Sequence, residues 1–243
     1  MMSPVALAPR DRLIVALDMT GLAEAEGLLD RLAGVVSTFK VGAQLFTAAG
    51  PAAVELVRKR GGRVFLDLKY HDIPATVSGA VREAARLGVT LLTAHASGGG
   101  EMLRAAAEAA RAEHGERPRV LAVTVLTSLG RGALQRELQI PVSVEGHVVH
   151  LATLAREAGC DGVVASPHEA GRLRHVLGRE CLIVTPGIRP AGAARDDQER
   201  IATAVAARRA GADYLVVGRP ITAAADPAAA AAALLDELAG AVA

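Results

Sequence analysis

The chain reads VFLDLKYHDIP from Val64 to Pro74, so an apolar run ends in an acid, a base and a second acid. If the run is a β-strand, its period of two places Asp67 and Lys69 on one face and leucines on the other. Desolvating a carboxylate or an ammonium is costly, so a buried strand has no structural need for this pair. We expect the two charges to serve chemistry at the carboxyl end of the strand.

The same unit, a short apolar strand followed by a helical segment, recurs along the chain. Strands are predicted at residues 13–17, 35–41, 64–68, 90–93, 120–125, 162–165, 182–184 and 214–217. Helical spacing is found at residues 22–32, 52–60, 77–87, 102–113, 148–158 and, as a final Ala-rich helix, 223–243. Eight strand and helix repeats in 243 residues favour a closed parallel barrel over an open doubly wound sheet. The predicted fold is α/β, a (β/α)8 TIM barrel in a single domain over residues 1–243.

Charge and composition restrict the class of partner. Lys and Arg number 27 and Asp and Glu 26, so a net charge of +1 draws the protein neither to nucleic acid nor to an anionic membrane. Aromatic residues make up 2% of the chain and Trp is absent, which disfavours base-stacking surfaces. We expect a small-molecule partner and no nucleic acid.

The N-terminus lacks the apolar region of a signal peptide, and no later segment is long, apolar and uncharged enough to span a bilayer. Cys160 and Cys181 have neither CxxC spacing nor His neighbours in a zinc pattern. We interpret them as buried or inert thiols in a reducing compartment. These features predict a cytoplasmic protein with no membrane partner.

Lysine is scarce in this chain. Lysine and arginine together number 27, yet the only lysines are Lys40, Lys59 and Lys69. Guanidinium cannot readily give up a proton, so a retained lysine indicates a site that needs a compact, titratable ammonium. Lys59 lies between two arginines and is interpreted as part of a solvated helix end. Lys40 and Lys69 both end apolar runs, which makes them the candidate functional lysines.

Active sites of such barrels lie at the carboxyl ends of the strands. Asp18 ends the first predicted strand, Lys40 the second, and Asp67 and Lys69 the third, with Asp72 just beyond. Four of these five are expected to line one side of the mouth with alternating sign. For Asp18 and Asp72 taken singly, capping of the following helix or a surface ion pair is an equally favoured alternative.

A second cluster follows the last two strands. Gly218 and Arg219 open a short helix after strand eight, where backbone N–H groups, the helix dipole and an Arg fork suit a phosphate. The loop after strand seven supplies Arg189. The alternative is that these arginines satisfy helix-end or inter-loop contacts. We favour a phosphate site because both loops offer Arg at the position that barrel enzymes often use for phosphate.

Two further segments lie at the same rim. Residues 191–198 are small or charged without an apolar period, which predicts a lid in which Gln198 contacts the ligand on closure. Thr127, after strand five, offers a hydroxyl and a backbone amide. A plain turn residue is the equally favoured alternative for Thr127.

Taken together, these motifs resemble the orotidine 5'-phosphate decarboxylase family from the first strand to the last. The quoted motifs are Ala16-Leu17-Asp18, Phe39-Lys40-Val41-Gly42, DLKYHDIP at 67–74, Leu126-Thr127-Ser128, Pro186-Gly187-Ile188-Arg189 and Val217-Gly218-Arg219-Pro220. The resemblance implies a (β/α)8 homodimer with shared active sites and no cofactor or metal. It also implies conversion of orotidine 5'-phosphate to uridine 5'-phosphate (UMP), the last step of de novo pyrimidine synthesis.

The resemblance implies roles for individual residues. Lys69 is the proton donor to C6, Asp67 and Lys40 belong to the same charged array, and Asp72 enters the active site of the partner subunit. Ligand contacts are implied for the ribose at Asp18 and Lys40, for the ligand at Thr76 and Thr127, and for the phosphate side at Arg189, Gln198, Gly218 and Arg219. Tyr70 and Ala75 depart from the Phe and Asn often found in the family, but neither change removes a charge.

The implied chemistry agrees with the residues. Loss of CO2 leaves a carbanion at C6 with no obvious electron sink, so a preorganised positive charge must stabilise it, and Lys69 can then deliver a proton. Each neighbouring carboxylate favours the ammonium form by about 4 kcal/mol at about 4 Å for an effective dielectric near 20. Phosphate binding energy is available to close a lid and hold the ring.

Two alternatives remain open. One is a related sugar-phosphate decarboxylase or aldolase barrel that uses Mg²⁺, which needs an acidic ligand where this chain has Lys40. The other is a non-catalytic barrel that binds nucleotide phosphates. The complete set Asp67, Lys69 and Asp72 argues against the second alternative.

Overall fold

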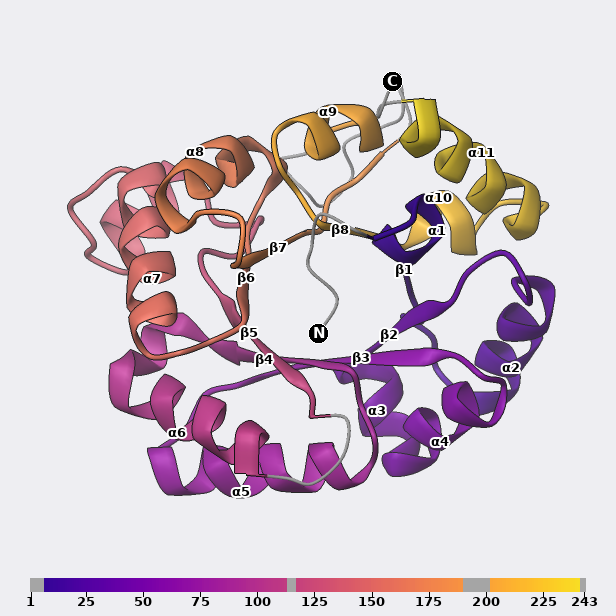
Figure 1. Cartoon of the computed structure of the whole chain (residues 1–243), viewed down its shortest axis with the longest axis horizontal. Coiled ribbons are helices and arrows are strands. Elements are labelled where there is room, and N and C mark those ends of the chain that lie inside the picture. Colours follow the sequence, from indigo (N-terminus) through magenta and orange to yellow (C-terminus); the bar gives the residue numbers. More distant parts are fainter. Residues whose placement is uncertain (1–6, 113–116, 190–201, 241–243) are drawn as a thin grey trace.

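The computed structural model describes residues 7–112, 117–189 and 202–240. Eight parallel strands close into a barrel in the order β1-β2-β3-β4-β5-β6-β7-β8, and β8 pairs with β1. Helices surround the strands as an outer ring (Figure 1). The predicted single (β/α)8 barrel is confirmed.

The strands are β1 Leu13–Ala16, β2 Thr38–Gly42, β3 Arg63–Tyr70, β4 Leu91–His95, β5 Arg119–Val123, β6 Gly162–Val164, β7 Leu182–Thr185 and β8 Tyr214–Val217. The α-helices are α1 Pro9–Arg12, α2 Leu22–Arg31, α3 Ala43–Ala49, α4 Pro51–Lys59, α5 Pro74–Arg86, α6 Gly99–Ala112, α7 Val144–Glu157, α8 Pro167–Leu177, α9 Ala204–Arg209, α10 Arg219–Thr222 and α11 Pro227–Gly240. A 3-10 turn, η2 Ala96–Gly98, follows β4, and a π-helical turn, η3 Ala133–Glu137, follows β5.

Several predicted boundaries were wrong, including the starts of the helices predicted from residues 77 and 148, which begin at Pro74 and Val144. Two others were wrong for local reasons. The second strand begins at Thr38 and not at Val35, because the amides of Val35 and Val36 donate to the carbonyl of Leu32 and prolong the end of α2. The final helix begins at Pro227 and not at residue 223, because residues 223–226 form a turn after α10, and the side chain of Asp226 accepts from the amide of Ala229 in the first turn of α11. In both places the residues before the element are mostly apolar but form a turn, and composition alone does not distinguish such a turn from a strand or helix.

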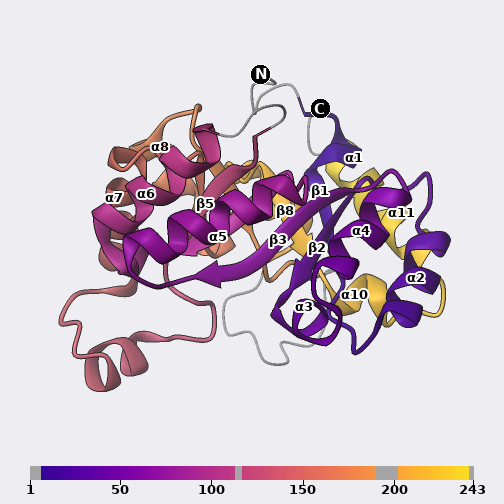
Figure 2. The ribbon, with the colours of Figure 1, turned by 90° about the horizontal axis from the view of Figure 1, so that it is seen from below.

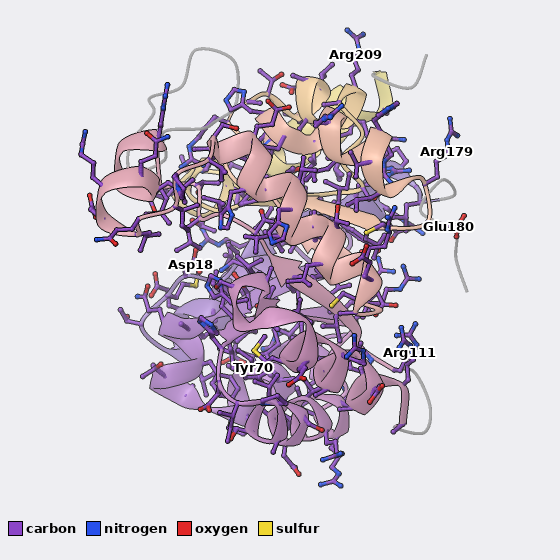
Figure 3. The ribbon with its side chains drawn as sticks, turned by 90° about the vertical axis from the view of Figure 1, so that its left-hand side faces the viewer. Asp18, Tyr70, Arg111, Arg179, Glu180 and Arg209 are labelled. Atoms are coloured by element: carbon purple, nitrogen blue, oxygen red, sulfur yellow. The ribbon has the colours of Figure 1, made fainter. Side chains whose placement is uncertain are left out.

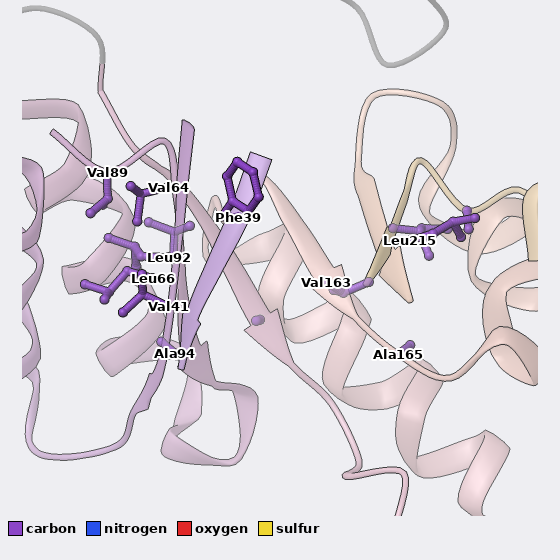
Figure 4. Packing of buried hydrophobic residues seen from close by; sticks show 14 of the residues in the cluster. Phe39, Val41, Val64, Leu66, Val89, Leu92, Ala94, Val163, Ala165 and Leu215 are labelled. Carbon is purple, nitrogen blue, oxygen red and sulfur yellow. The ribbon is translucent and has the colours of Figure 1, made fainter. Parts of the chain in front are cut away.

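Side chains alternate between the two faces of each strand, so the core consists of one layer inside the barrel and one between the strands and the helices. Ile14, Ala16 and Phe65 belong to a small cluster of buried side chains inside the barrel. Leu66 belongs to the larger cluster between the strands and the helices, and Leu68 packs against it. Figure 4 shows part of this outer layer. The period of two predicted for β3 is confirmed, so the inner face that carries Phe65 leads on to Asp67.

The two cysteines are poor nucleophiles. Burial raises the pKa of the Cys160 thiol to about 12 and the pKa of the Cys181 thiol to about 11. Both are free cysteines, and both are thiols at neutral pH. The interpretation of inert thiols agrees with this environment.

The segment between β5 and α7 is the longest described departure from the strand and helix pattern. It contains η3 and the exposed side chains of Leu138 and Val142. Figure 2 shows this segment, in salmon, projecting past the barrel on the side of α3 and α10, the helices that directly follow β2 and β8. It therefore extends from the end of the barrel at which the strands terminate. Within the described ranges, no helix is long and apolar enough to cross a membrane.

A buried carboxylate ties two strands together at the opposite end of the barrel. Asp213 immediately precedes β8 and is 5% exposed. One of its carboxylate oxygens, Oδ2, accepts hydrogen bonds from Arg174 Nη2 at 2.6 Å and from the backbone N–H of Ile183 at 2.9 Å. This interaction fixes the start of β8 against β7 and α8.

We expect Asp213→Ala to lower the free energy of unfolding by about 3 kcal/mol, because it removes the carboxylate partner of the Arg174 guanidinium and the acceptor of a buried amide. Urea denaturation measures this loss. Asp236→Ala, at an exposed position on α11, is the control and should change stability by less than about 0.5 kcal/mol. Equal unfolding midpoints for the two variants would contradict the assigned role of Asp213.

Candidate active site

A cavity of about 440 Å³ opens at the carboxyl ends of the strands, a volume in the usual range for small-molecule sites. Strands or following loops from all repeats except the fourth contribute to its described lining. The lining residues are Ala16, Asp18, Lys40, Phe65, Asp67, Lys69, Val123, Val125, Leu126, Thr127, Val164, Ala165, Pro186, Gly187, Arg189, Val216, Gly218, Arg219 and Thr222. Both clusters predicted from the sequence therefore face one cavity.

Four charged side chains form a continuous array on one wall of this cavity. Lys40 Nζ donates to Asp18 Oδ1 at 2.8 Å and lies 3.7 Å from Asp67 Oδ2. Lys69 Nζ donates to the same oxygen of Asp67 at 2.9 Å. The order Asp18, Lys40, Asp67, Lys69 alternates in sign, as the sequence predicted.

Exposure differs along the array. The side chains of Lys40 and Asp67 are each 12% exposed, that of Lys69 is 36% exposed and that of Asp18 is 55% exposed. Lys69 therefore combines access to a ligand with a fixed, nearly buried counter-ion. This combination suits a group that must present positive charge and a proton to a bound molecule.

Asp67 is held in its ionised form. Burial alone raises the pKa of a carboxyl group, but Lys40 and Lys69, with hydrogen bonds from Lys69 and Thr93, hold the pKa of Asp67 below its ordinary value. Asp67 is a carboxylate at neutral pH, and the stability that this pairing contributes is lost only as the pH falls through the lowered pKa.

A glycine makes room for the inner lysine. A Cβ atom at Gly42 would lie 2.7 Å from Lys40 Nζ and 3.1 Å from Asp18 Oδ1. A side chain here would push the Lys40 ammonium from its place, so Gly42 at the end of β2 leaves room for the ion pair of Asp18 and Lys40. Gly42 belongs to the same sequence motif as Lys40, but the sequence alone did not predict why a glycine is needed there.

The second predicted cluster lies in the loops after β7 and β8. Gly218 precedes α10, and its carbonyl accepts from the amides of Ile221 and Thr222. Arg219 is exposed at the start of α10, whereas Arg189 is 7% exposed. Both arginines line the cavity. The two loops thus meet at one cavity, and Thr127 lines the same cavity.

The alternative of helix capping was wrong for both aspartates. The residue that precedes α2 is Gly21, so Asp18 does not cap that helix. The residue that precedes α5 is Ile73, and no side chain caps it, while Asp72 Oδ1 accepts from the neighbouring amide of Ile73 at 2.6 Å. Asp18 instead lines the cavity, and Asp72 is exposed in the loop that leads to α5.

Two predicted site residues are not brought to the cavity, and a third is not among the described residues. Asp72 and Thr76 are exposed around the start of α5 and do not belong to the described lining. Gln198 and the predicted lid lie outside the described residues. The sequence reasoning in turn missed Thr222 and Ala165, because neither carries a charge or a distinctive motif.

Among the described residues, no three His, Cys, Asp or Glu side chains are placed to hold a metal ion together. Where an acidic ligand would be needed on β2, the ammonium of Lys40 stands between Asp18 and Asp67. The donor set at the charged wall therefore does not fit a divalent cation.

Comparisons with known proteins give one consistent result. Residues 11–234 match the model of the orotidine 5'-phosphate decarboxylase / HUMPS family. An orotidine 5'-phosphate decarboxylase from Moorella thermoacetica is 56% identical over 238 residues, covering 96% of this chain and 94% of that protein. One from Pelobacter propionicus is 55% identical over 230 residues, covering 94% and 95%. The crystal structure of the Lactobacillus acidophilus enzyme of the same name superposes with a TM-score of 0.83 at 38% identity, covering 94% of this chain and 99% of that one.

Proposed function

Because the chain belongs to the orotidine 5'-phosphate decarboxylase / HUMPS family and catalyses decarboxylation of orotidine 5'-phosphate in UMP biosynthesis, we propose that Lys69 stabilises and protonates the C6 carbanion. One observation carries this proposal. Lys69 Nζ is held 2.9 Å from Asp67 Oδ2 on the wall of the cavity that Arg189 and Arg219 also line.

The chemistry follows from charge. When the bond between C6 and the carboxylate breaks, CO2 leaves and the electron pair stays on C6. An ammonium fixed beside that carbon lowers the energy of the developing carbanion more than it lowers that of the substrate, which is the condition for acceleration. Lys69 then gives a proton to C6 to form UMP, and solvent returns a proton to its amine.

The other members of the array keep Lys69 in place. Asp67 is the nearly buried counter-ion that holds the ammonium, and Lys40 shares Asp67 Oδ2 with Lys69. Lys40 and Asp18 then offer a donor and an acceptor to the ribose hydroxyls. Because the array is preorganised, little reorganisation is needed as charge develops at C6.

Arg219, Gly218, Arg189 and Gln198 serve the phosphate end in this proposal, and Thr127 contacts the bound nucleotide. Binding of a group remote from C6 fixes the ring against Lys69, so binding energy at one end of the ligand is used at the other. The support is the position of Gly218, Arg189 and Arg219 in the same cavity as the charged array.

We expect Arg219→Ala to lower kcat/KM about 10- to 100-fold, because a charge-assisted hydrogen bond contributes about 1.5–3 kcal/mol. Initial rates over a range of orotidine 5'-phosphate concentrations measure this change. Arg209→Ala is the matched control, because Arg209 lies at the outer surface on α9, away from Asp18 (Figure 3). An unchanged kcat/KM for Arg219→Ala would contradict a role in binding phosphate.

The active unit in this proposal is a homodimer with shared sites. Asp72 and Thr76 are exposed in their own chain, although the family resemblance assigns both to the site. Ile73, between them in sequence, is 66% exposed. The large hydrophobic side chains that are exposed in the described ranges all lie in the loops after β3 and β5, at Ile73, Leu126, Leu138 and Val142.

A second copy accounts for both observations, because it covers exposed apolar side chains of these loops and receives Asp72 and Thr76 in its cavity. The cytoplasmic location stays a prediction from the sequence.

Turnover is expected to need no added metal. Purified protein treated with EDTA and transferred to metal-free buffer should consume orotidine 5'-phosphate, followed by absorbance, at the same rate as untreated protein. The rival sugar-phosphate decarboxylase or aldolase that uses Mg²⁺ predicts loss of activity with chelator and recovery with Mg²⁺. That result would overturn the metal-free proposal, and the position of Lys40 argues against it.

A further inference from the structure

The backbone at Lys69 departs from a regular strand. Its φ of 51° lies in the left-handed region, which a side chain as long as lysine adopts only at a cost in energy. Within the described residues, Gln139 is the other non-glycine with a positive φ. A conformation of this kind persists only where neighbouring groups hold it, so the residues around Lys69 must supply that support.

The departure coincides with a break in the pairing of β3 and β4. Phe65 pairs with Leu91 and Leu66 with Leu92, and pairing resumes only at Tyr70 with Ala94. Residues 67–69 of β3 therefore face a single residue of β4, which is Thr93. Such a bulge interrupts the ladder of backbone hydrogen bonds and re-aims the side chains that it carries.

At the bulge, the hydroxyl of Thr93 takes the place of a backbone acceptor for the amide of Lys69. The backbone N–H of Lys69 donates to Thr93 Oγ1 at 2.9 Å, and Thr93 Oγ1 donates to Asp67 Oδ1 at 2.9 Å. The other oxygen of Asp67 accepts from Lys69 Nζ at 2.9 Å. One buried hydroxyl thus joins the backbone of Lys69 to the carboxylate that holds its ammonium, in a closed ring of hydrogen bonds.

From this ring we propose that Thr93 is a positioning residue for decarboxylation. From the neighbouring strand β4, it holds Lys69 in the position that faces the reacting carbon. The inference rests on the proposed function of Lys69. Thr93 is fully buried and does not belong to the described lining of the cavity, so it acts through Asp67 and Lys69 and not by touching the ligand.

Three variants of the full chain test the proposal. Thr93→Val keeps the shape of the side chain and removes the hydroxyl, and Thr93→Ser keeps the hydroxyl. Thr38→Val makes the same change as Thr93→Val at a buried barrel threonine that starts β2 and accepts a hydrogen bond from Arg63 Nε at 3.2 Å. Measurements are kcat and KM for orotidine 5'-phosphate and the Kd for UMP by calorimetry.

Thr93→Val is expected to lower kcat about 10- to 100-fold, because a shift of about 1 Å in a reacting group has effects of this size. UMP has no carboxylate at C6, so its Kd reports on the rest of the site and should change less than about threefold. Thr93→Ser should recover kcat to within about threefold of the original enzyme, and Thr38→Val should leave kcat unchanged.

A kcat for Thr93→Val within twofold of the original enzyme would overturn the proposal, and so would equal impairment of Thr93→Ser and Thr93→Val. If Thr93→Val does not fold, Thr93→Ala removes the same hydroxyl and carries the same expectations. Failure of the proposed function has a different signature, because Lys69→Ala would then retain turnover. If Lys69→Ala loses turnover while Thr93→Val keeps it, only the role of Thr93 is rejected.

Discussion

Lys69→Ala is expected to lower kcat for orotidine 5'-phosphate by roughly four to six orders of magnitude. The substitution removes the positive charge that faces C6 and the proton donor together, and each of these contributes about 10²- to 10³-fold in enzymes. The Kd for UMP should change less than about tenfold, because phosphate and ribose contacts come from other residues. Absorbance assays and calorimetry measure the two quantities.

The three lysines of the chain provide their own controls. Lys59 is exposed on α4, where it forms an ion pair with Glu55, so Lys59→Ala should leave kcat unchanged. Lys69→Arg keeps the charge but not the ability to give up a proton, so it should remain severely impaired. A Lys69→Arg variant with nearly full activity would contradict proton donation by Lys69.

Two inactive variants are expected to restore activity when their chains are mixed. Lys69→Ala keeps Asp72, and Asp72→Ala keeps Lys69, so a mixed dimer with shared sites contains one complete site. Random reassortment of equal amounts gives about one quarter of the original activity, because half the dimers are mixed and each has one working site. Mild denaturation and refolding of the mixture, followed by the absorbance assay, measures the recovery.

The matched control uses two residues that act in the same chain. Asp67 and Lys69 are joined by a hydrogen bond within one subunit, so mixing Asp67→Asn with Lys69→Ala should restore nothing. If the pair of Lys69→Ala and Asp72→Ala also fails to recover although mixed dimers form, the sites are not shared.

The charged wall was predictable because its determinants are local. A period of two fixes which residues of β3 point inward, and the carboxyl ends of parallel strands meet at one rim, so Asp18, Lys40, Asp67 and Lys69 could be placed together from sequence alone. The same rule brought Gly218 and Arg219 to the cavity. Alternation of strands and helices was likewise sufficient to predict the closed barrel.

Other features depend on geometry that no local pattern encodes. The bulge at residues 67–69 and its hydrogen bonds to Thr93 arise from how β3 meets β4, and Thr93 looks like any other threonine in a strand. Whether Asp18 caps α2 or lines the cavity depended on where α2 begins, and α2 begins at Leu22 with Gly21 as its cap residue. The predicted start of the second strand at residue 35 was wrong because valine is equally suited to a strand and to a buried turn.

The most direct test of the central claim, that Lys69 carries out the chemical step, is a single turnover with enzyme in excess over orotidine 5'-phosphate. Under these conditions all substrate is bound, so the rate of UMP formation reports the chemical step apart from substrate affinity. We predict that Lys69→Ala retains the bound nucleotide unreacted over times in which the original enzyme and Lys59→Ala convert it completely. Formation of UMP by Lys69→Ala at a rate near that of the original enzyme would contradict the account.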